Sequence, residues 1–320
     1  MLVVGLGMAG AGYLWVQSPL ALSQPVVDVS IEPGSSAREV ASQLTKAGVQ
    51  APASWLYWWF RLSGQSRAIK AGSYELTTGA TPASLLRKLV QGDEALRSVT
   101  LLEGWNIRQV REALRKAAFL QPTTQSLGNA ALMAQLGRPD MHPEGRFFPD
   151  TYTYAKGSTD LALLKRALTA MDQSLDAAWS QRNPQLPLQS ADQALVLASI
   201  IEKETGRAQE QGQISAVFNN RLSIGMRLQT DPTVIYGLGE AFDGNLRKVD
   251  LLTDTSYNTY TRIGLPPTPI SMPGKSALLA AVQPAASRAL YFVARGDGSS
   301  HFSDSLDEHN RAVNKYQRGQ

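Results

Sequence analysis

The chain of 320 residues contains no cysteine, which excludes disulfides and thiolate metal sites. Histidine is scarce as well, and the three residues, His142, His301 and His309, lack the spacing of paired metal ligands. Neither a Gly-x-Ser-x-Gly sequence nor a phosphate-binding glycine loop occurs. The net charge is only +4, without the clustered basic residues that nucleic-acid binding requires. We therefore expect no metal, no nucleotide cofactor and no nucleic-acid partner.

Residues 1–27 carry no charged side chain. Residues 2–16 are apolar apart from glycines and Tyr13, and Pro19 ends the run. A full membrane span needs roughly 20 residues, so the run is short. It fits a membrane anchor, a secretory signal with a cleavage-like site at residues 21–23, or a helix of the core. Of these, we expect a transmembrane anchor over residues 1–22.

An internal repeat follows the N-terminal run. An alternating strand pattern, a glycine and an amphipathic pattern occupy residues 29–47, and the same order recurs at residues 99–117. A weaker copy occupies residues 74–89. Each copy predicts a strand, a tight turn and a helix, although the units are too few for a solenoid. We expect one small β/α domain over residues 26–95 and a connecting β/α segment over residues 96–160.

Three tryptophans, Trp55, Trp58 and Trp59, lie between the first two units. Exposed aromatic rings can stack on sugars, but the spacing i, i+3, i+4 is more typical of a helix face turned toward a core. We therefore expect these rings to be buried.

The most informative stretch surrounds two glutamates, Glu202 and Glu204. Ser190 predicts a helix N-cap, and apolar residues at 194, 197, 198 and 201 form one helical face. Glu204 extends that face, whereas Glu202 stands about 200° away around the helix axis. Burial would raise the pKa of the Glu204 carboxyl, as a proton donor at neutral pH requires. Spacing alone also allows both glutamates to be solvated in the last turn.

A second amphipathic pattern follows around Phe218 and ends in polar residues that include Asn220. The polar segment 229–233 comes next. Pro232 restricts Asp231 to extended conformations, so we expect a stiff loop there. Such a loop could position a substrate or merely end a structural element.

These segments resemble the MltG (YceG-like) family of endolytic murein transglycosylases, over nearly the whole chain and in the same order. The matching segments are residues 144–145, 147–152, 202–205, 218–222, 226–236, 257–260, 264–267, 270–274 and 301–303. The resemblance implies cleavage of the β-1,4 bond between N-acetylmuramic acid and N-acetylglucosamine in peptidoglycan. Water takes no part, and a 1,6-anhydromuramic end remains.

By the same resemblance, Glu204 is the catalytic acid and no cofactor is needed. Ordinary glycosidases use two carboxyls, but here the 6-hydroxyl of the substrate itself attacks the anomeric carbon. The candidates for binding the sugar are Gln229, Thr230, Asp231, Asn258, Tyr260 and Asn220. Each of these could instead stabilise its own loop.

The resemblance further implies an α+β architecture: an N-terminal membrane helix, a LysM-like β/α subdomain and a mixed α/β catalytic domain over residues 161–320. It implies a single-pass protein of the cell inner membrane, with the catalytic domain in the periplasm. Peptidoglycan glycan strands are the expected partner, and peptidoglycan synthases are a further candidate.

Two other classes remain open. One is a non-catalytic scaffold that binds peptidoglycan through the LysM-like units, against which the intact Glu204 and its polar neighbours argue. The other is a hydrolase that uses Glu202 and Glu204 as a pair, although side chains two residues apart on a helix diverge.

Overall fold

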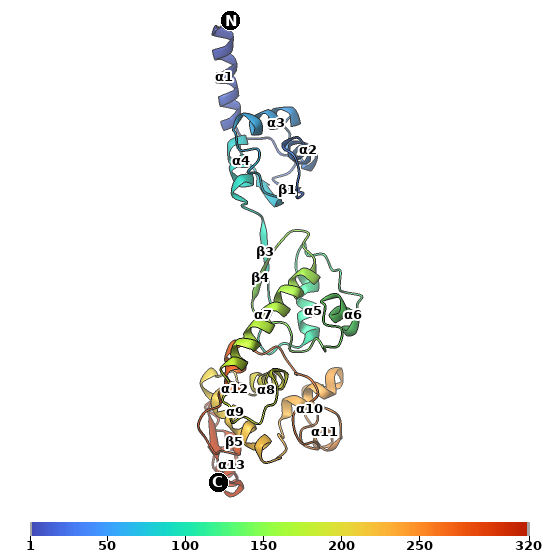
Figure 1. Ribbon diagram of the computed structural model, residues 1–320, viewed down its shortest axis with the longest axis vertical. Coiled ribbons are helices and arrows are strands. Elements are labelled where there is room, and N and C mark those ends of the chain that lie inside the picture. Colours follow the sequence, from blue (N-terminus) through green and yellow to red (C-terminus); the bar gives the residue numbers. More distant parts are fainter. Residues whose placement is uncertain (1, 319–320) are drawn as a thin grey trace. The chain divides into compact units, whose positions relative to one another are not determined.

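The computed structural model describes residues 2–318, with side chains from residue 10 onward (Figure 1). The chain forms two compact units. Unit 1 comprises the residues up to 98 together with 118–121 and 153–158, and unit 2 comprises 99–117, 122–152 and the residues from 159 onward. The segment 96–160, expected to be a connector, is therefore shared between the two units.

Unit 1 is built around one antiparallel strand pair. Its elements are α1 (Leu2–Gln17), β1 (Val26–Ile31), α2 (Ala37–Ala47), α3 (Ala53–Leu62), β2 (Gly72–Thr77) and α4 (Pro82–Gln91). β1 pairs with β2 so that Val29 lies opposite Tyr74. The alternating residues Val27, Val29 and Ile31 are buried, as one covered sheet face requires.

The repeated β/α units predicted from the sequence are confirmed. β1 leads into α2, β2 into α4, and β3 (Leu96–Thr100) into α5 (Ile107–Lys116). In each turn the equivalent glycine has a positive φ: 83° at Gly34, 93° at Gly79 and 73° at Gly104. A side chain there would be strained, which explains why glycine recurs at this position.

The prediction for the tryptophans is wrong at two of three positions. Trp55 and Trp58 are 55% and 57% exposed, whereas Leu56 and Phe60 face the core of unit 1. Trp59 is half-buried, and its Nε1–H donates to the Pro82 carbonyl at 3.0 Å.

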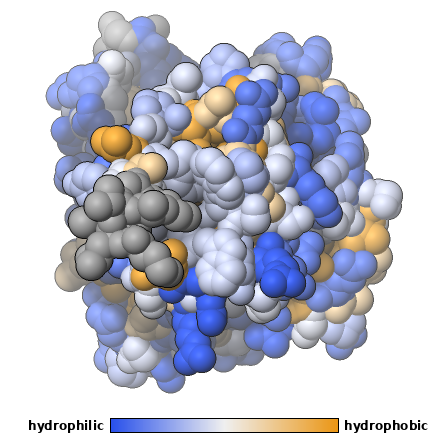
Figure 2. Space-filling model, turned by 90° about the horizontal axis from the view of Figure 1, so that it is seen from above, coloured by the Kyte–Doolittle hydropathy of each residue, from blue (hydrophilic) through white to orange (hydrophobic). Residues whose placement is uncertain are grey.

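In Figure 2, seen from above, hydrophobic residues form small separate groups among hydrophilic ones.

The N-terminal run forms a helix of 16 residues, α1. Among residues 2–318, no helix reaches the length and hydropathy needed to cross a membrane. The expected transmembrane helix is therefore not confirmed as such.

Unit 2 is mainly helical, with short strands. Its elements after α5 are α6 (Asn129–Gln135), α7 (Asp160–Ser180), α8 (Ala191–Glu204), α9 (Ala208–Ser223), α10 (Asp231–Leu238), η1 (Gly239–Ala241), α11 (Lys248–Leu252), α12 (Lys275–Val282), β5 (Tyr291–Ala294), β6 (Ser300–Ser303), α13 (Leu306–Val313) and η2 (Asn314–Arg318). The strand β4 (Thr151–Ala155) begins in unit 2 and continues into unit 1 from residue 153. β3 pairs with β4, and β5 pairs with β6. The mixed α+β class expected from the sequence is confirmed.

The centre of unit 2 is α8, which contacts α7, α9, α10 and α12 (Figure 1). Every side chain from residue 194 to 201 is buried, so this part of the helix is enclosed on all sides. Ser199 is the one polar residue of this buried run, and its Oγ donates to the Val196 carbonyl and accepts from the Ile270 N–H at 3.0 Å. A fully enclosed helix gives its last residue a fixed position.

Candidate active site

Glu204 is the last residue of α8, at the point where the enclosed helix ends. Ser190 caps the start of the helix as predicted, because its side chain accepts from the Gln193 N–H. Thr205 is extended, with φ −146°, and turns the chain away. The carboxyl of Glu204 is therefore carried by a rigid element and reaches the surface of the core.

Thr230, the N-cap of α10, donates a hydrogen bond from its hydroxyl to the Glu204 carboxylate. Thr230 is only 2% exposed. Its N–H donates to Thr259 Oγ1 at 3.1 Å, and its carbonyl accepts from Thr233 Oγ1 at 2.8 Å. Because both its backbone groups are bonded, Thr230 holds the carboxyl of Glu204 in one orientation.

The electrostatics of this site favour a protonated glutamate. Burial raises the pKa of the Glu204 carboxyl, and the negative charge of Asp231 raises it further. The hydrogen bond from Thr230 and the positive charge of Arg221 oppose the shift, but the net direction is upward. The carboxyl therefore keeps its proton to a higher pH than an exposed glutamate does, as a general acid requires.

The polar segment after α9 differs from the stiff loop that we expected. Asp231 is the first residue of α10 and is not extended; the extended residue is Thr230, with φ −119°. Pro232 lies in the first helical turn, where its missing N–H leaves no bond unmade. Gln229 has φ 49°, a left-handed conformation, and its N–H donates to the Thr259 carbonyl at 3.1 Å.

Asp231 and Tyr260 form a second polar pair at the site. The Tyr260 hydroxyl donates to Asp231 Oδ1 at 2.5 Å. Arg221 lies near them and is held by two carbonyls, because its Nε donates to Leu290 at 2.7 Å and its Nη1 to Leu228 at 2.5 Å. The site therefore combines one carboxyl with a raised pKa, one fixed carboxylate and one fixed cation.

These groups open onto a cavity of about 590 Å³. One wall comprises Glu204, Arg221, Gln229, Thr230, Asp231 and Tyr260, and the other is formed by residues of β5, α13 and η2. The second wall includes Tyr291 and His309, whose rings stack at 5.2 Å. Four of the six predicted binding residues, Gln229, Thr230, Asp231 and Tyr260, thus line one cavity with Glu204. None of the residues of the second wall was predicted from the sequence as a site residue.

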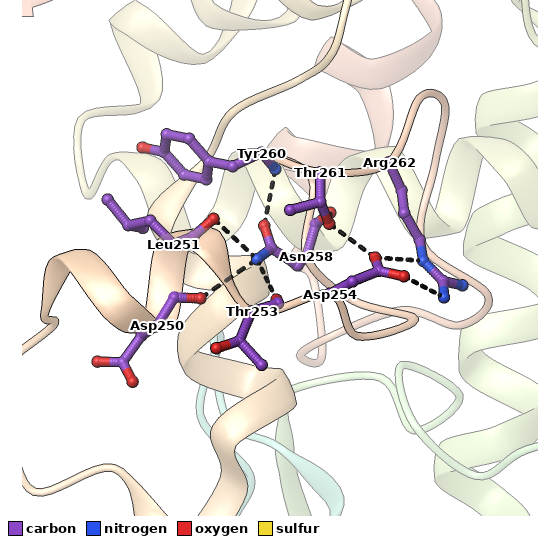
Figure 3. A network of polar contacts seen from close by, with 8 residues as sticks. All are labelled: Asp250, Leu251, Thr253, Asp254, Asn258, Tyr260, Thr261 and Arg262. Atoms are coloured by element: carbon purple, nitrogen blue, oxygen red, sulfur yellow. Dashed lines mark hydrogen bonds and ion pairs between the residues drawn. The ribbon is translucent and has the colours of Figure 1, made fainter.

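The other two predicted binding residues hold the backbone. Asn258 is 1% exposed, and its amide donates to the carbonyls of Asp250, Leu251 and Thr253 (Figure 3). Its Oδ1 accepts from the Tyr260 N–H at 2.8 Å.

Asn220 likewise donates to two carbonyls, those of Ser287 and Ala289, at 3.0 Å each. Asn220 and Asn258 are not among the residues that line the cavity. The structure therefore favours a structural role for both amides.

Glu202 lies apart from this cavity. Its carboxylate accepts a hydrogen bond from the Gly274 N–H at 2.9 Å, at the start of α12. The carboxyls of Glu202 and Glu204 are thus bonded to different segments, a geometry that fits the supporting role expected for Glu202.

Glu144 is a buried carboxyl that the sequence did not single out as functional. It is 1% exposed and accepts from the Ile107 N–H at 3.0 Å and from the Tyr236 hydroxyl at 3.0 Å. Burial raises its pKa to about 7, against lowering contributions from these hydrogen bonds. It joins the start of α5 to α10 and does not line the cavity beside Glu204.

Within the described part of the chain, no group of three or more His, Asp or Glu side chains could hold a metal ion.

Comparison with known proteins shows which proteins this chain is similar to. A protein of Bacillus subtilis named endolytic murein transglycosylase is 32% identical over 311 residues, which cover 92% of this chain and 86% of that protein. A protein of Streptococcus pneumoniae with the same name is 27% identical over 340 residues, covering 94% of this chain and 61% of that protein.

A solved structure has a similar fold. The 2.6 Å crystal structure of a yceG-like protein from Listeria monocytogenes is 29% identical, with a TM-score of 0.56 over 90% of this chain and 99% of that one. The model of the YceG-like family matches residues 29–315. The chain belongs to the YceG-like family.

Proposed function

We propose that the chain is an endolytic peptidoglycan lytic transglycosylase in which Glu204 serves as acid and then as base. The observation that carries this proposal is the Glu204 carboxyl, fixed at the end of an enclosed helix with a raised pKa and facing a cavity of about 590 Å³. The names of the bacillary and streptococcal relatives support the same reaction.

The reaction needs two proton transfers, both made by the Glu204 carboxyl. Protonated Glu204 donates to the glycosidic oxygen as the bond from that oxygen to the anomeric carbon breaks. The Glu204 carboxylate then takes the proton of the 6-hydroxyl, whose oxygen forms the new bond to the anomeric carbon. The products are a free 4-hydroxyl and a 1,6-anhydro sugar, and no water is consumed.

Asp231 suits the stabilisation of positive charge at the anomeric carbon. It lines the same cavity, and the Tyr260 hydroxyl fixes its carboxylate. A fixed charge beside a developing opposite charge lowers the barrier without reorganisation. Thr230 acts through Glu204 because its hydroxyl is already donated to that carboxyl. We therefore place it as a positioning residue.

The glycan strand would occupy the cavity between its two walls. Gln229 and Tyr260 offer polar groups on one wall, and Asn310 offers an amide on the other. Tyr291 and Phe292 add aromatic faces on which sugar rings can stack.

We also propose that the β/α units are LysM-like and contact glycan strands, and that α1 anchors the chain at the cell inner membrane with both units in the periplasm. The uncharged residues 1–27 support the anchor. An anchored enzyme would act beside peptidoglycan synthases on nascent strands.

The reaction is tested with the full chain on isolated peptidoglycan, by identifying the product ends by mass spectrometry. We expect 1,6-anhydro ends from the wild type and a loss of roughly 10²–10⁴-fold in Glu204→Gln. Glu202→Gln is the matched control, because its amide oxygen can still accept from Gly274. Reducing ends would identify a hydrolase, and a wild type that binds without cutting would identify a scaffold.

A further inference from the structure

Helix α3 is apolar on two faces. Its inner face, Leu56 and Phe60, is fully buried in unit 1. Its outer face carries Trp55, Trp58 and Leu62, which are 55%, 57% and 80% exposed. A helix with apolar residues on two faces normally has both faces covered, yet more than half of each of these three residues remains exposed.

The outer face of α3 is continuous with the end of α1. Trp15 of α1 meets Trp55 edge to face, with ring centroids 5.5 Å apart. The two helices border a groove of about 760 Å³, which also takes in Tyr13, Trp58 and Leu62. We call these five residues the aromatic collar: Tyr13, Trp15, Trp55, Trp58 and Leu62.

The composition of the collar matches the boundary of a lipid bilayer. Tryptophan and tyrosine concentrate where acyl chains meet headgroups. The sequence between Glu39 and Glu75, which contains α3, has no acidic residue but carries Lys46, Arg61, Arg67 and Lys70. Of these, Arg61 belongs to α3 itself, and a cation beside an apolar face is attracted to anionic lipid headgroups.

The place of the collar on α1 points the same way. Aromatic side chains at the C-terminal end of an apolar helix act as interfacial anchors where the helix meets a bilayer. The collar lies at that end of α1 and supplies such anchors.

We infer that the aromatic collar rests in the interfacial layer of a lipid bilayer, so that unit 1 is seated on the membrane surface beside α1. The inference rests on the proposed anchoring by α1 and is independent of the chemistry at Glu204. A sugar fits the collar less well, because Gln17 supplies the only amide among the groove residues described, which are otherwise apolar or aromatic.

The absence of cysteine allows a direct test with the full chain. A single cysteine is introduced as Leu62→Cys in the collar, or as Glu32→Cys on the exposed turn after β1, and is labelled with an environment-sensitive fluorophore. Each protein is reconstituted in vesicles of phosphatidylethanolamine and phosphatidylglycerol, with or without nitroxide-labelled lipid. Flotation of the vesicles measures anchoring separately.

We expect the label at position 62 to shift to shorter wavelength and to be quenched several-fold more strongly by nitroxide lipid than the label at position 32. Adding Trp55→Ser and Trp58→Ser should reduce the quenching at position 62 toward that of the control. Both rings are more than half exposed, so the core of unit 1 remains intact.

Other outcomes overturn the inference in distinguishable ways. Flotation with equal quenching at both positions would leave the anchor but remove the collar's role. Failure to float would remove the anchor and the collar's role together, without touching the reaction on peptidoglycan. A shift that disappears on dilution into excess lipid would indicate a second copy of the chain. A shift produced by soluble glycan fragments and not by vesicles would indicate sugar binding.

Discussion

The hydroxyl of Thr230 donates its hydrogen bond to the carboxylate of Glu204, and so joins the first turn of α10 to the last residue of α8. This bond stabilises the charged form of the acid, while burial stabilises the neutral form. The balance of the two sets the pH range in which Glu204 can donate its proton.

Removing the Thr230 hydroxyl should shift the pH profile of activity to higher pH. In Thr230→Val the pKa of Glu204 rises further, because the hydrogen bond that lowers it is lost. A general acid works only while protonated, so the alkaline limb of the activity profile shifts to higher pH. We expect activity at the optimum to fall about tenfold to a hundredfold, because the carboxyl loses its orientation. Thr230→Ser keeps the hydroxyl and should restore both the alkaline limb and the activity at the optimum. An unchanged alkaline limb in Thr230→Val would argue against a role of Thr230 in setting the pKa of Glu204.

Neutralising Asp231 should move the same limb in the opposite direction. The negative charge of Asp231 raises the pKa of Glu204, so Asp231→Asn lowers it and the alkaline limb shifts to lower pH. We also expect kcat to fall by roughly 10²-fold, with KM little changed, since the charge acts on the transition state. Tyr260→Phe, which frees the Asp231 carboxylate, should show a smaller loss in kcat. A change confined to KM would identify Asp231 as a simple binding residue.

Glu144 should make stability depend on pH. Its pKa is raised to about 7 in the folded chain, from 4.5. Below about pH 4.5, Glu144 therefore makes its full contribution to the free energy of unfolding. This contribution is lost as the pH rises through about 7, a change in the free energy of unfolding on the order of 3 kcal/mol. Glu144→Gln is neutral throughout, so its free energy of unfolding should vary less across this window. Urea titrations at several pH values measure the difference, and parallel curves for the two proteins would contradict the assignment.

Asn258 should matter for stability more than for sugar binding. Asn258→Ala leaves three carbonyls and the Tyr260 N–H without their partner, which should cost about 2–4 kcal/mol in urea denaturation. Asp254→Asn is the control in the same loop; its exposed ion pair with Arg262 should contribute little (Figure 3). A large rise in KM with unchanged stability would return Asn258 to the substrate-binding residues.

Local patterns in the sequence predicted several features correctly. The glycine that recurs in each β/α unit marked Gly34, Gly79 and Gly104, because a positive φ depends on the residue itself. The N-cap at Ser190 was also predicted correctly, because capping depends on residues close together in the sequence. The helical face that Glu204 extends was predicted from the spacing of nearby apolar residues.

Features that depend on distant segments were not readable. The second cavity wall comes from β5 and α13, nearly a hundred residues after Glu204, and helical spacing gives no information about such pairing. Asp231 was expected to be extended because it precedes a proline, but Thr230 takes that conformation and the helix starts one residue later. Trp55 and Trp58 matched a buried stripe, yet Leu56 and Phe60 occupy the core-facing positions.

The way the chain alternates between its two units has a consequence for synthesis on the ribosome. Unit 1 needs residues 118–121 and 153–158, and the Ser73 hydroxyl, for example, donates to the Lys156 carbonyl at 2.8 Å. When residue 98 has been made, unit 1 still lacks these segments. At about 5–20 residues per second, roughly 3–12 s pass before residue 158 follows. Unit 1 therefore cannot be completed when its first 98 residues have been made, and residues 99–117 and 122–152 of unit 2 must be made while unit 1 waits for its last segment.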